Sequence, residues 1–314
     1  MRRAGFVLRR LASAVPVLVA VLTLSFVMMQ LVPGDPVQTM LSGAGPAPTP
    51  EQEQALRHQL GLDRPLHEQY FGFLADAVRG DFGRSVQTGE PVVSAISAVA
   101  PASAELALFA LVLSLVFGVG IAVLGRVATG PLRSLCHGVP VVFMSTPGYW
   151  VALVLIEVFS FRLTWFPATG DAGFGALVLP AVTLALPAIG VIAQVLGTSL
   201  AAVDAEAFVV TARAKGAGRW RVLLRHALRN ASIPTITLVG TTVGNLLAAA
   251  VIAETVFARP GLGRLTLQAI TNHDIPVLQG VVALLGVLYV VVNLLVDLCY
   301  VLVDPRVTAD RIRD

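Results

Sequence analysis

Residues 99–124 read VAPASAELALFALVLSLVFGVGIAVL, and Glu105 is the only charged residue among them. At 1.5 Å per residue, about 20 apolar residues in a helix cross the roughly 30 Å hydrocarbon core of a bilayer, so this stretch predicts a transmembrane helix. Five further stretches meet the same test, namely residues 11–32, 135–159, 174–203, 233–257 and 277–303. The sequence therefore predicts an all-α polytopic membrane protein with six transmembrane helices.

The composition of the 314-residue chain supports this class. Hydrophobic residues make up 56% and charged residues only 13%, whereas soluble domains carry about a quarter charged residues. The formal net charge is +3, but the basic residues recur between apolar runs and form no stripe, which argues against a nucleic-acid partner. The two cysteines, Cys136 and Cys299, are too few for a disulfide framework, and we expect both to be inert thiols.

The distribution of arginine and lysine predicts the orientation. Most of the 22 basic residues lie in segments that are inside when both termini are cytoplasmic. The basic start of the chain, with Arg2, Arg3, Arg9 and Arg10, resembles a signal peptide. The apolar run that follows is longer than a typical signal sequence, so we expect an uncleaved first helix.

Two loops are long enough to fold. The external loop, residues 33–98, has proline and glycine turns around two stretches with helical apolar spacing, 52–60 and 66–78. The inner loop, residues 204–232, is basic, lacks proline and predicts one or two short helices. The expected organisation is residues 1–32 as the N-terminus and first helix, 33–98 as an outer cap, and 99–314 as the core that contains the inner loop.

The inner loop divides into two amphipathic runs. Residues 205–215 predict a helix that stops at Gly216, with Lys215 at the negative end of the helix dipole. The second run carries four large apolar residues among arginines: Trp220, Val222, Leu223 and Leu224. The pattern alone also fits a basic interfacial helix held by anionic lipid.

Motifs for nucleotide binding, metal binding and hydrolysis are missing from the sequence. Lys215 is the only lysine and lies between Ala214 and Gly216, so the chain has no Gly-Lys-Ser/Thr phosphate loop. It also has no His-Glu-x-x-His, Cys-x-x-Cys or Gly-x-Ser-x-Gly motif, and its five histidines are scattered over different loops. We expect no catalytic residue, no metal and no cofactor in this chain.

Four acids lie within or near the ends of the predicted spans: Glu105, Glu157, Glu254 and Asp297. A charged side chain at the bilayer centre costs about 2.5–3.5 kcal/mol on insertion scales, so each acid needs a partner or water. They could form a proton relay or line a pathway. Alternatively, the three glutamates reach a water interface, and Asp297 bonds to a neighbouring helix. Asp297 is the only aspartate inside a span, which excludes an aspartyl dyad within the chain.

Short motifs along the chain resemble those of one family, the inner-membrane permeases of ATP-binding-cassette (ABC) importers for dipeptides, oligopeptides and nickel. ARAKGAG (212–218) and RHALRNASIP (225–234) are similar to that family's cytoplasmic EAA loop. By position, Val210, Thr211 and Ala212 replace the loop's Glu-Ala-Ala, while Gly216 and Leu228 match its glycine and later leucine. The other matching motifs are LVPGDPV (31–37), LGLDRP (60–65), GDFGRS (80–85), STPGYW (145–150), ETVF (254–257), PGLG (260–263) and DPR (304–306).

The resemblance implies a MetI-like permease fold in a bacterial inner membrane. It also implies three kinds of partner: a second, similar but non-identical permease, two ABC ATPase subunits that hold ATP and Mg²⁺, and an extracytoplasmic substrate-binding protein. Half of the translocation pore would come from this chain. Nothing in the sequence separates a dipeptide, an oligopeptide, a nickel chelate or glutathione as substrate.

The resemblance also assigns roles to residues. Contact with the ATPase would fall to Val210, Thr211, Ala212, Arg213, Lys215, Gly216, Ala217, Arg219, Arg221 and Leu228. Contact with the binding protein would fall to Pro33, Gly34, Asp35, Pro36, Asp81 and Gly83. Glu254 and Asp297 match positions where the family carries acids, which favours a structural role for both. The alternative is a proton-coupled secondary transporter without ATPase subunits, in which we would expect an inverted repeat, and the sequence shows none.

Overall fold

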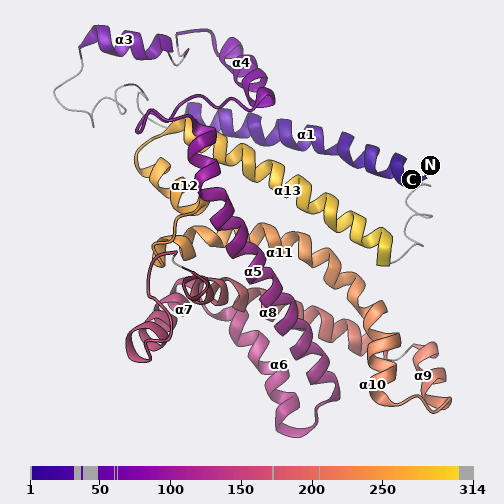
Figure 1. Cartoon of the computed structure of the whole chain (residues 1–314). Coiled ribbons are helices and arrows are strands. Elements are labelled where there is room, and N and C mark those ends of the chain that lie inside the picture. The colour runs from indigo at the N-terminus through magenta and orange to yellow at the C-terminus, as the bar shows by residue number, and fades with distance from the viewer. Residues whose placement is uncertain are drawn as a thin grey trace. The chain divides into compact units, whose positions relative to one another are not determined.

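Figure 1 shows a computed structural model of the chain, which describes residues 2–31, 37, 49–59, 61, 63–171, 173–204 and 206–303. Within these residues the regular elements are helices, and the only strand-like pairing is an isolated bridge between Arg84 and Pro91. The chain forms two compact units. Unit 1 comprises residues 1–101 and 264–291, and unit 2 comprises residues 102–263 and 292–314.

The described residues form α-helices and two π-helical segments. In chain order they are α1 (Arg2–Leu31), α3 (Pro50–Gln59), α4 (Leu66–Arg79), α5 (Val92–Val127), α6 (Gly130–Ser145), α7 (Gly148–Leu155), η1 (Ile156–Arg162), α8 (Gly175–Val203), α9 (Ala207–Ala214), α10 (Arg219–Arg221), η2 (Val222–Ala227), α11 (Leu228–Val256), α12 (Leu262–Thr271) and α13 (Ile275–Val303). The segments η1 and η2 are π-helical. Helices α3 and α4 confirm the two helical stretches predicted in the external loop.

Four helices in the described residues are long and apolar enough to cross a membrane by themselves. They are α5, α8, residues Leu238–Val256 of α11 and residues Ile275–Val296 of α13. Four of the six predicted spans are thereby confirmed. The apolar part of α1, Ala12–Met28, is shorter than these four, so the structure does not confirm the count of six.

The predicted span over residues 135–159 is wrong as one continuous helix. The axes of α6 and the α7–η1 segment differ by 103° at a break that contains Thr146 and Pro147. Proline lacks an N–H and pushes the residue before it out of the helical region. Thr146 accordingly has φ −89° and ψ 126°, which is extended backbone. Apolar sequence continues across the break while the chain changes direction.

Helix α8 forms the centre of unit 2 and packs against α6, α7 and α11 (Figure 1). Its most apolar part is 72% buried, far more than that of the other spanning helices. Gly190 lets α6 approach closely, because a Cβ at this position would lie 2.6 Å from the Cγ of Met144 and from the carbonyl oxygen of Pro140. Small residues at such crossings allow helix backbones to pack tightly in membranes.

In unit 1, α4 packs along α1. The hydroxyl groups of Thr23 and Tyr70 lie 2.8 Å apart, and the rings of Phe26 and Tyr70 meet edge to face at 5.5 Å between centroids. Helix α4 ends at Gly80, whose φ of 75° is the left-handed conformation that favours glycine. The amphipathic spacing of residues 66–78 therefore marks a helix that packs on α1 through its aromatic side.

Candidate functional site

Helix α9 begins the inner loop that the sequence assigns to ATPase contact. It ends in a Schellman motif, in which the Gly216 N–H donates to Arg213 O at 2.9 Å and the Ala217 N–H donates to Ala212 O at 3.1 Å. Gly216 has φ +81°, which a residue with a side chain adopts only under strain. The helix stop predicted at Gly216 is confirmed.

The second half of the loop is not separate from the following span. Segments α10, η2 and α11 succeed one another without a break from Arg219 to Val256. Residues 219–233 contain neither glycine nor proline, so nothing in this sequence ends the helix. The boundary that we predicted near residue 232 therefore lies inside one continuous helical segment.

One face of the loop is anchored and the other is exposed. Val209 of α9 is fully buried, and Val222 and Leu223 of η2 are 2% and 4% exposed. Leu223 belongs to a hydrophobic cluster with Leu196 and Leu200 of α8. By contrast, four large apolar side chains of the loop face outward with 40–57% exposure: Phe208, Val210, Trp220 and Leu224. The loop thus presents apolar groups on a basic surface whose other face packs on the core.

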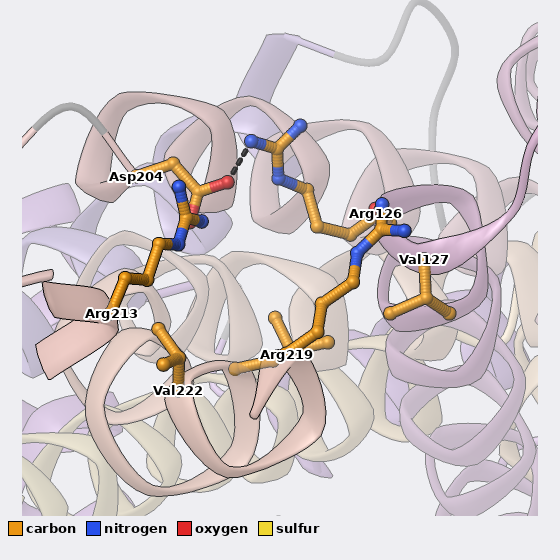
Figure 2. A pocket seen from close by; sticks show the side chains of 7 residues that line it. Arg126, Val127, Asp204, Arg213, Arg219 and Val222 are labelled. Atoms are coloured by element: carbon orange, nitrogen blue, oxygen red, sulfur yellow. Dashed lines mark hydrogen bonds and ion pairs between the residues drawn. The ribbon is translucent and has the colours of Figure 1, made fainter. Parts of the chain in front are cut away.

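A charged cluster joins this loop to the ends of α5 and α8 (Figure 2). Asp204, just after α8, accepts from the Arg126 guanidinium of α5 and, at 3.0 Å, from the Arg213 guanidinium of α9. The Arg219 guanidinium donates to the backbone oxygen of Arg126 at 2.7 Å. These groups surround a cavity of about 350 Å³, whose apolar wall consists of Val127, Val222 and Leu223.

Of the predicted coupling residues, the structure brings Arg213 and Arg219 together in this cluster. The side chains of the other residues in the set, among them Val210, Lys215 and Arg221, do not line the cavity. Sequence reasoning missed Asp204 and used Arg126 only for orientation. The available signal was an acid at the start of a predominantly basic loop.

Glu254 lies at a second polar cluster, at the C-terminal end of α11. Its carboxylate is fully buried and accepts from the Ser103 hydroxyl at 2.5 Å and from the Gly263 N–H at 2.7 Å. Ser103 in turn accepts from the Leu262 N–H at 2.7 Å. These two N–H groups begin α12, so Glu254 and Ser103 satisfy donors that the helix itself leaves unpaired. Glu254 does not reach solvent, contrary to one of the two interpretations drawn from the sequence.

The other acids have separate partners. Glu105 pairs with Arg259 at 2.8 Å, where the arginine side chain is 3% exposed and the glutamate 61%. Glu157 pairs with Arg162 at 3.0 Å on an exposed surface. Asp297 lies in α13, and its side chain is outside the described residues. No group of three metal-binding side chains occurs among the residues that the structure describes.

The predicted outer-face residues fall into two sets. Pro33, Gly34, Asp35 and Pro36 lie outside the described residues. Asp81 and Gly83 belong to a tight turn, in which the Asp81 carboxylate accepts from the Gly83 N–H at 2.9 Å. Shortly after this turn, Ser85 donates its hydroxyl to Asp274, and the Gln87 amide donates to Asn272 O at 3.1 Å. These bonds fasten the turn to the segment between α12 and α13.

Comparison with known proteins identifies the family. Residues 114–309 match the family described as "Binding-protein-dependent transport system inner membrane component". The chain belongs to this family. Residues 3–107 of the permease also match the family's N-terminal region, "Binding-prot-dependent transport system membrane comp, N-term". The resemblance drawn from short motifs is therefore confirmed over nearly the whole chain.

Relatives of the permease match it over almost their full length. The probable peptide ABC transporter permease protein y4tP of Sinorhizobium fredii is 37% identical over 312 residues, which cover 96% of the permease and 98% of that protein. The di/tripeptide transport system permease protein DppB of Pseudomonas aeruginosa is 36% identical over 338 residues, with 98% and 99% coverage.

A solved structure shares the fold of the permease. A chain of the MetNI methionine ABC transporter, in an inward-facing conformation, superposes with a TM-score of 0.56 at 18% sequence identity. The superposition covers 64% of the permease and 93% of that chain. At this identity the likeness concerns the fold alone, and it supports the MetI-like architecture predicted from the motifs.

Proposed function

We propose that this chain is a membrane-spanning subunit of an ATP-driven importer and forms half of the translocation pore for peptides or related small solutes. Family membership and the peptide and di/tripeptide permeases among its relatives support this function. Its partners are a second, homologous but non-identical permease, an extracytoplasmic binding protein and two ABC ATPase subunits, which hold the ATP and Mg²⁺. Both termini lie on the cytoplasmic side of a bacterial inner membrane, as the basic residues indicate.

The observation that carries this proposal is the two-faced inner loop. Its inner face is fixed to the core through Val209, Val222 and Leu223, so a force on the loop reaches α8 and α11. Its outer face exposes Val210 and Trp220 among basic residues, and exposed apolar patches with polar rims mark protein interaction sites. This face is the docking surface for an ATPase subunit, and the Schellman turn at Gly216 fixes its shape.

The hydrogen bonds and ion pairs of Glu254 and Glu105 argue against the alternative of a proton-coupled carrier. A proton relay needs carboxyl groups that exchange protons along a path. Glu254 is held by Ser103 and the Gly263 N–H at the start of a helix, and Glu105 is held by Arg259. Both acids therefore serve as fixed acceptors for neighbouring donors.

The turn that contains Asp81 and Gly83 forms part of the surface for the binding protein. The residues that follow the turn, Ser85 and Gln87, bond to Asp274 and Asn272 and attach it to the segment between α12 and α13. Pro33, Gly34, Asp35 and Pro36 belong to the same proposed surface.

The decisive experiment alters the outer face of the inner loop. We expect Val210→Asp to reduce both ATPase co-purification and peptide uptake in proteoliposomes by at least about tenfold, because an unpaired carboxylate buried in an interface costs about 1.4 kcal/mol or more. Val210→Thr conserves the volume without adding charge and should keep co-purification and uptake within about threefold of the parent chain. Normal uptake and co-purification in Val210→Asp would contradict the proposed docking surface.

A further inference from the structure

The charged cluster around Asp204 contains more positive than negative groups. Three guanidinium groups, those of Arg126, Arg213 and Arg219, line the cavity together with a single carboxylate. Both oxygens of that carboxylate are already engaged, one by Arg126 and the other by Arg213. Arg133 adds further positive potential at Arg126. The cavity is therefore an electropositive pocket, in which one carboxylate faces three guanidinium groups.

Two donors of this pocket remain available. Arg219 bonds to a neutral backbone oxygen, and within the described part of the chain it forms no ion pair with a carboxylate. The Nε–H of Arg126 is buried and has no hydrogen-bond partner among the described residues. A buried donor without an acceptor is unfavourable, so the Nε–H of Arg126 calls for an acceptor that the described residues do not supply. The exposed guanidinium of Arg219 lines the same cavity and can bind an anion there.

The size and place of the pocket indicate the kind of anion. A cavity of about 350 Å³ accommodates a tetrahedral oxyanion with an organic substituent, and guanidinium groups match the geometry of phosphate oxygens. The pocket lies where the spanning helices α5 and α8 end, at Val127 and Val203. Basic pockets at such helix ends bind the head groups of anionic lipids.

From these observations we infer that the pocket between α5, α8 and the inner loop binds a phosphate group, carried either by an anionic phospholipid or by a soluble phosphate compound. The bound phosphate accepts from Arg219 and from the Nε–H of Arg126, while Asp204 holds the other guanidinium groups in place. The ligand thus joins the inner loop to the ends of two spanning helices. This inference concerns the chain by itself and does not depend on ATPase docking.

The test uses Trp220, which lies next to Arg219 and is 54% exposed, as a fluorescent reporter. The other two tryptophans are replaced in a Trp150→Phe/Trp165→Phe background, and the purified, delipidated full chain is studied in mild detergent. It is titrated with dihexanoyl phosphatidylglycerol, with inorganic phosphate, and with dihexanoylglycerol as a probe that lacks phosphate. We expect a saturable response to at least one phosphate-containing probe and none to dihexanoylglycerol.

Matched arginine variants separate the pocket from the general charge of the loop. Arg219→Gln should raise the dissociation constant of the phosphate probe about tenfold or more, because it removes a charge-assisted hydrogen bond. Arg225→Gln changes the same charge at an exposed position of the same loop and should alter the constant less than about twofold. Arg219→Lys keeps the charge but lacks the planar guanidinium group, so its dissociation constant should lie between those of the other two variants. This variant also serves as the test if Arg219→Gln does not fold.

The outcomes are distinct. Tighter binding of phosphatidylglycerol than of inorganic phosphate would identify the source as lipid, and equal binding would identify it as a soluble phosphate compound. Equal effects of Arg219→Gln and Arg225→Gln, or no saturable response to either probe, would overturn the inference. Failure of ATPase docking alone would leave these titrations unchanged.

Discussion

Replacing Gly261 with alanine tests the buried cluster around Glu254. A Cβ at Gly261 would overlap the carboxyl group of Glu254. The end of a glutamate side chain normally moves aside at little cost, but this one is fully buried and bound to the Ser103 hydroxyl and the Gly263 N–H. The carboxylate can therefore make room only by giving up at least one of these bonds.

The expected loss of stability follows from two contributions. Forcing an additional methyl group into a packed site costs about 1–3 kcal/mol. Breaking one hydrogen bond to a buried charged group adds about 1.5–3 kcal/mol. We therefore expect Gly261→Ala to lower the free energy of unfolding by about 2.5–6 kcal/mol. Gly120→Ala in α5 is the matched control, because no atom lies within 4 Å of its Cβ, and it should be neutral or stabilising by up to about 1 kcal/mol.

The assay is unfolding of the purified chain in mixed micelles, followed by circular dichroism, in a double-mutant cycle with Glu254→Ala. Because Glu254→Ala removes the carboxyl group that the new methyl would strike, Gly261→Ala should cost less than about 1 kcal/mol in that background. Gly263→Ala should not be rescued in the same way, since its Cβ would also overlap the backbone of Val251. An equal cost of Gly261→Ala in both backgrounds would refute the reasoning.

Two further predictions concern packing and topology. Gly190→Ala should destabilise the chain by about 1–3 kcal/mol, because its Cβ would lie 2.6 Å from the Cγ of Met144. Gly197→Ala in the same helix has open space around its Cβ and should be neutral, and the same unfolding assay compares the two variants. A cysteine at Gln87 should react with an impermeant thiol reagent added outside cells and one at Ala217 should not, and the reverse labelling pattern would overturn the proposed orientation.

Hydropathy located four of the spanning helices but could not show where the helix axis changes direction within an apolar stretch. Residues 135–159 are predominantly apolar, and averaging over a window of that length hides the break at Thr146 and Pro147. The proline itself was a local signal for the break, because it excludes helical geometry from the residue before it. The stop at Gly216 was predictable for a similar reason, since its cause lies within the few residues of one helix end.

The polar clusters depend on residues that are distant in the chain. Arg126 and Asp204 are 78 positions apart, and Ser103 and Glu254 are 151 positions apart. No periodicity or composition connects such pairs, so the sequence showed only that an acid in a span needs a partner. The resemblance to a family favoured a structural role for Glu254, but the hydroxyl and the amide that bind it became visible only in the folded chain.

The separation of Ser103 from Glu254 also has a consequence for biogenesis. At synthesis rates of about 5–20 residues per second, Glu254 leaves the ribosome roughly 8–30 s after Ser103. Burial of the Glu254 carboxylate requires the Ser103 hydroxyl as its donor. Helix α5, which carries Ser103, must therefore be inserted before the C-terminal end of α11 can pack. The first half of the chain thus acts as a template for the second. If the ribosome pauses between the two, the Ser103 hydroxyl lacks its partners Glu254 and Leu262 in the partly assembled chain.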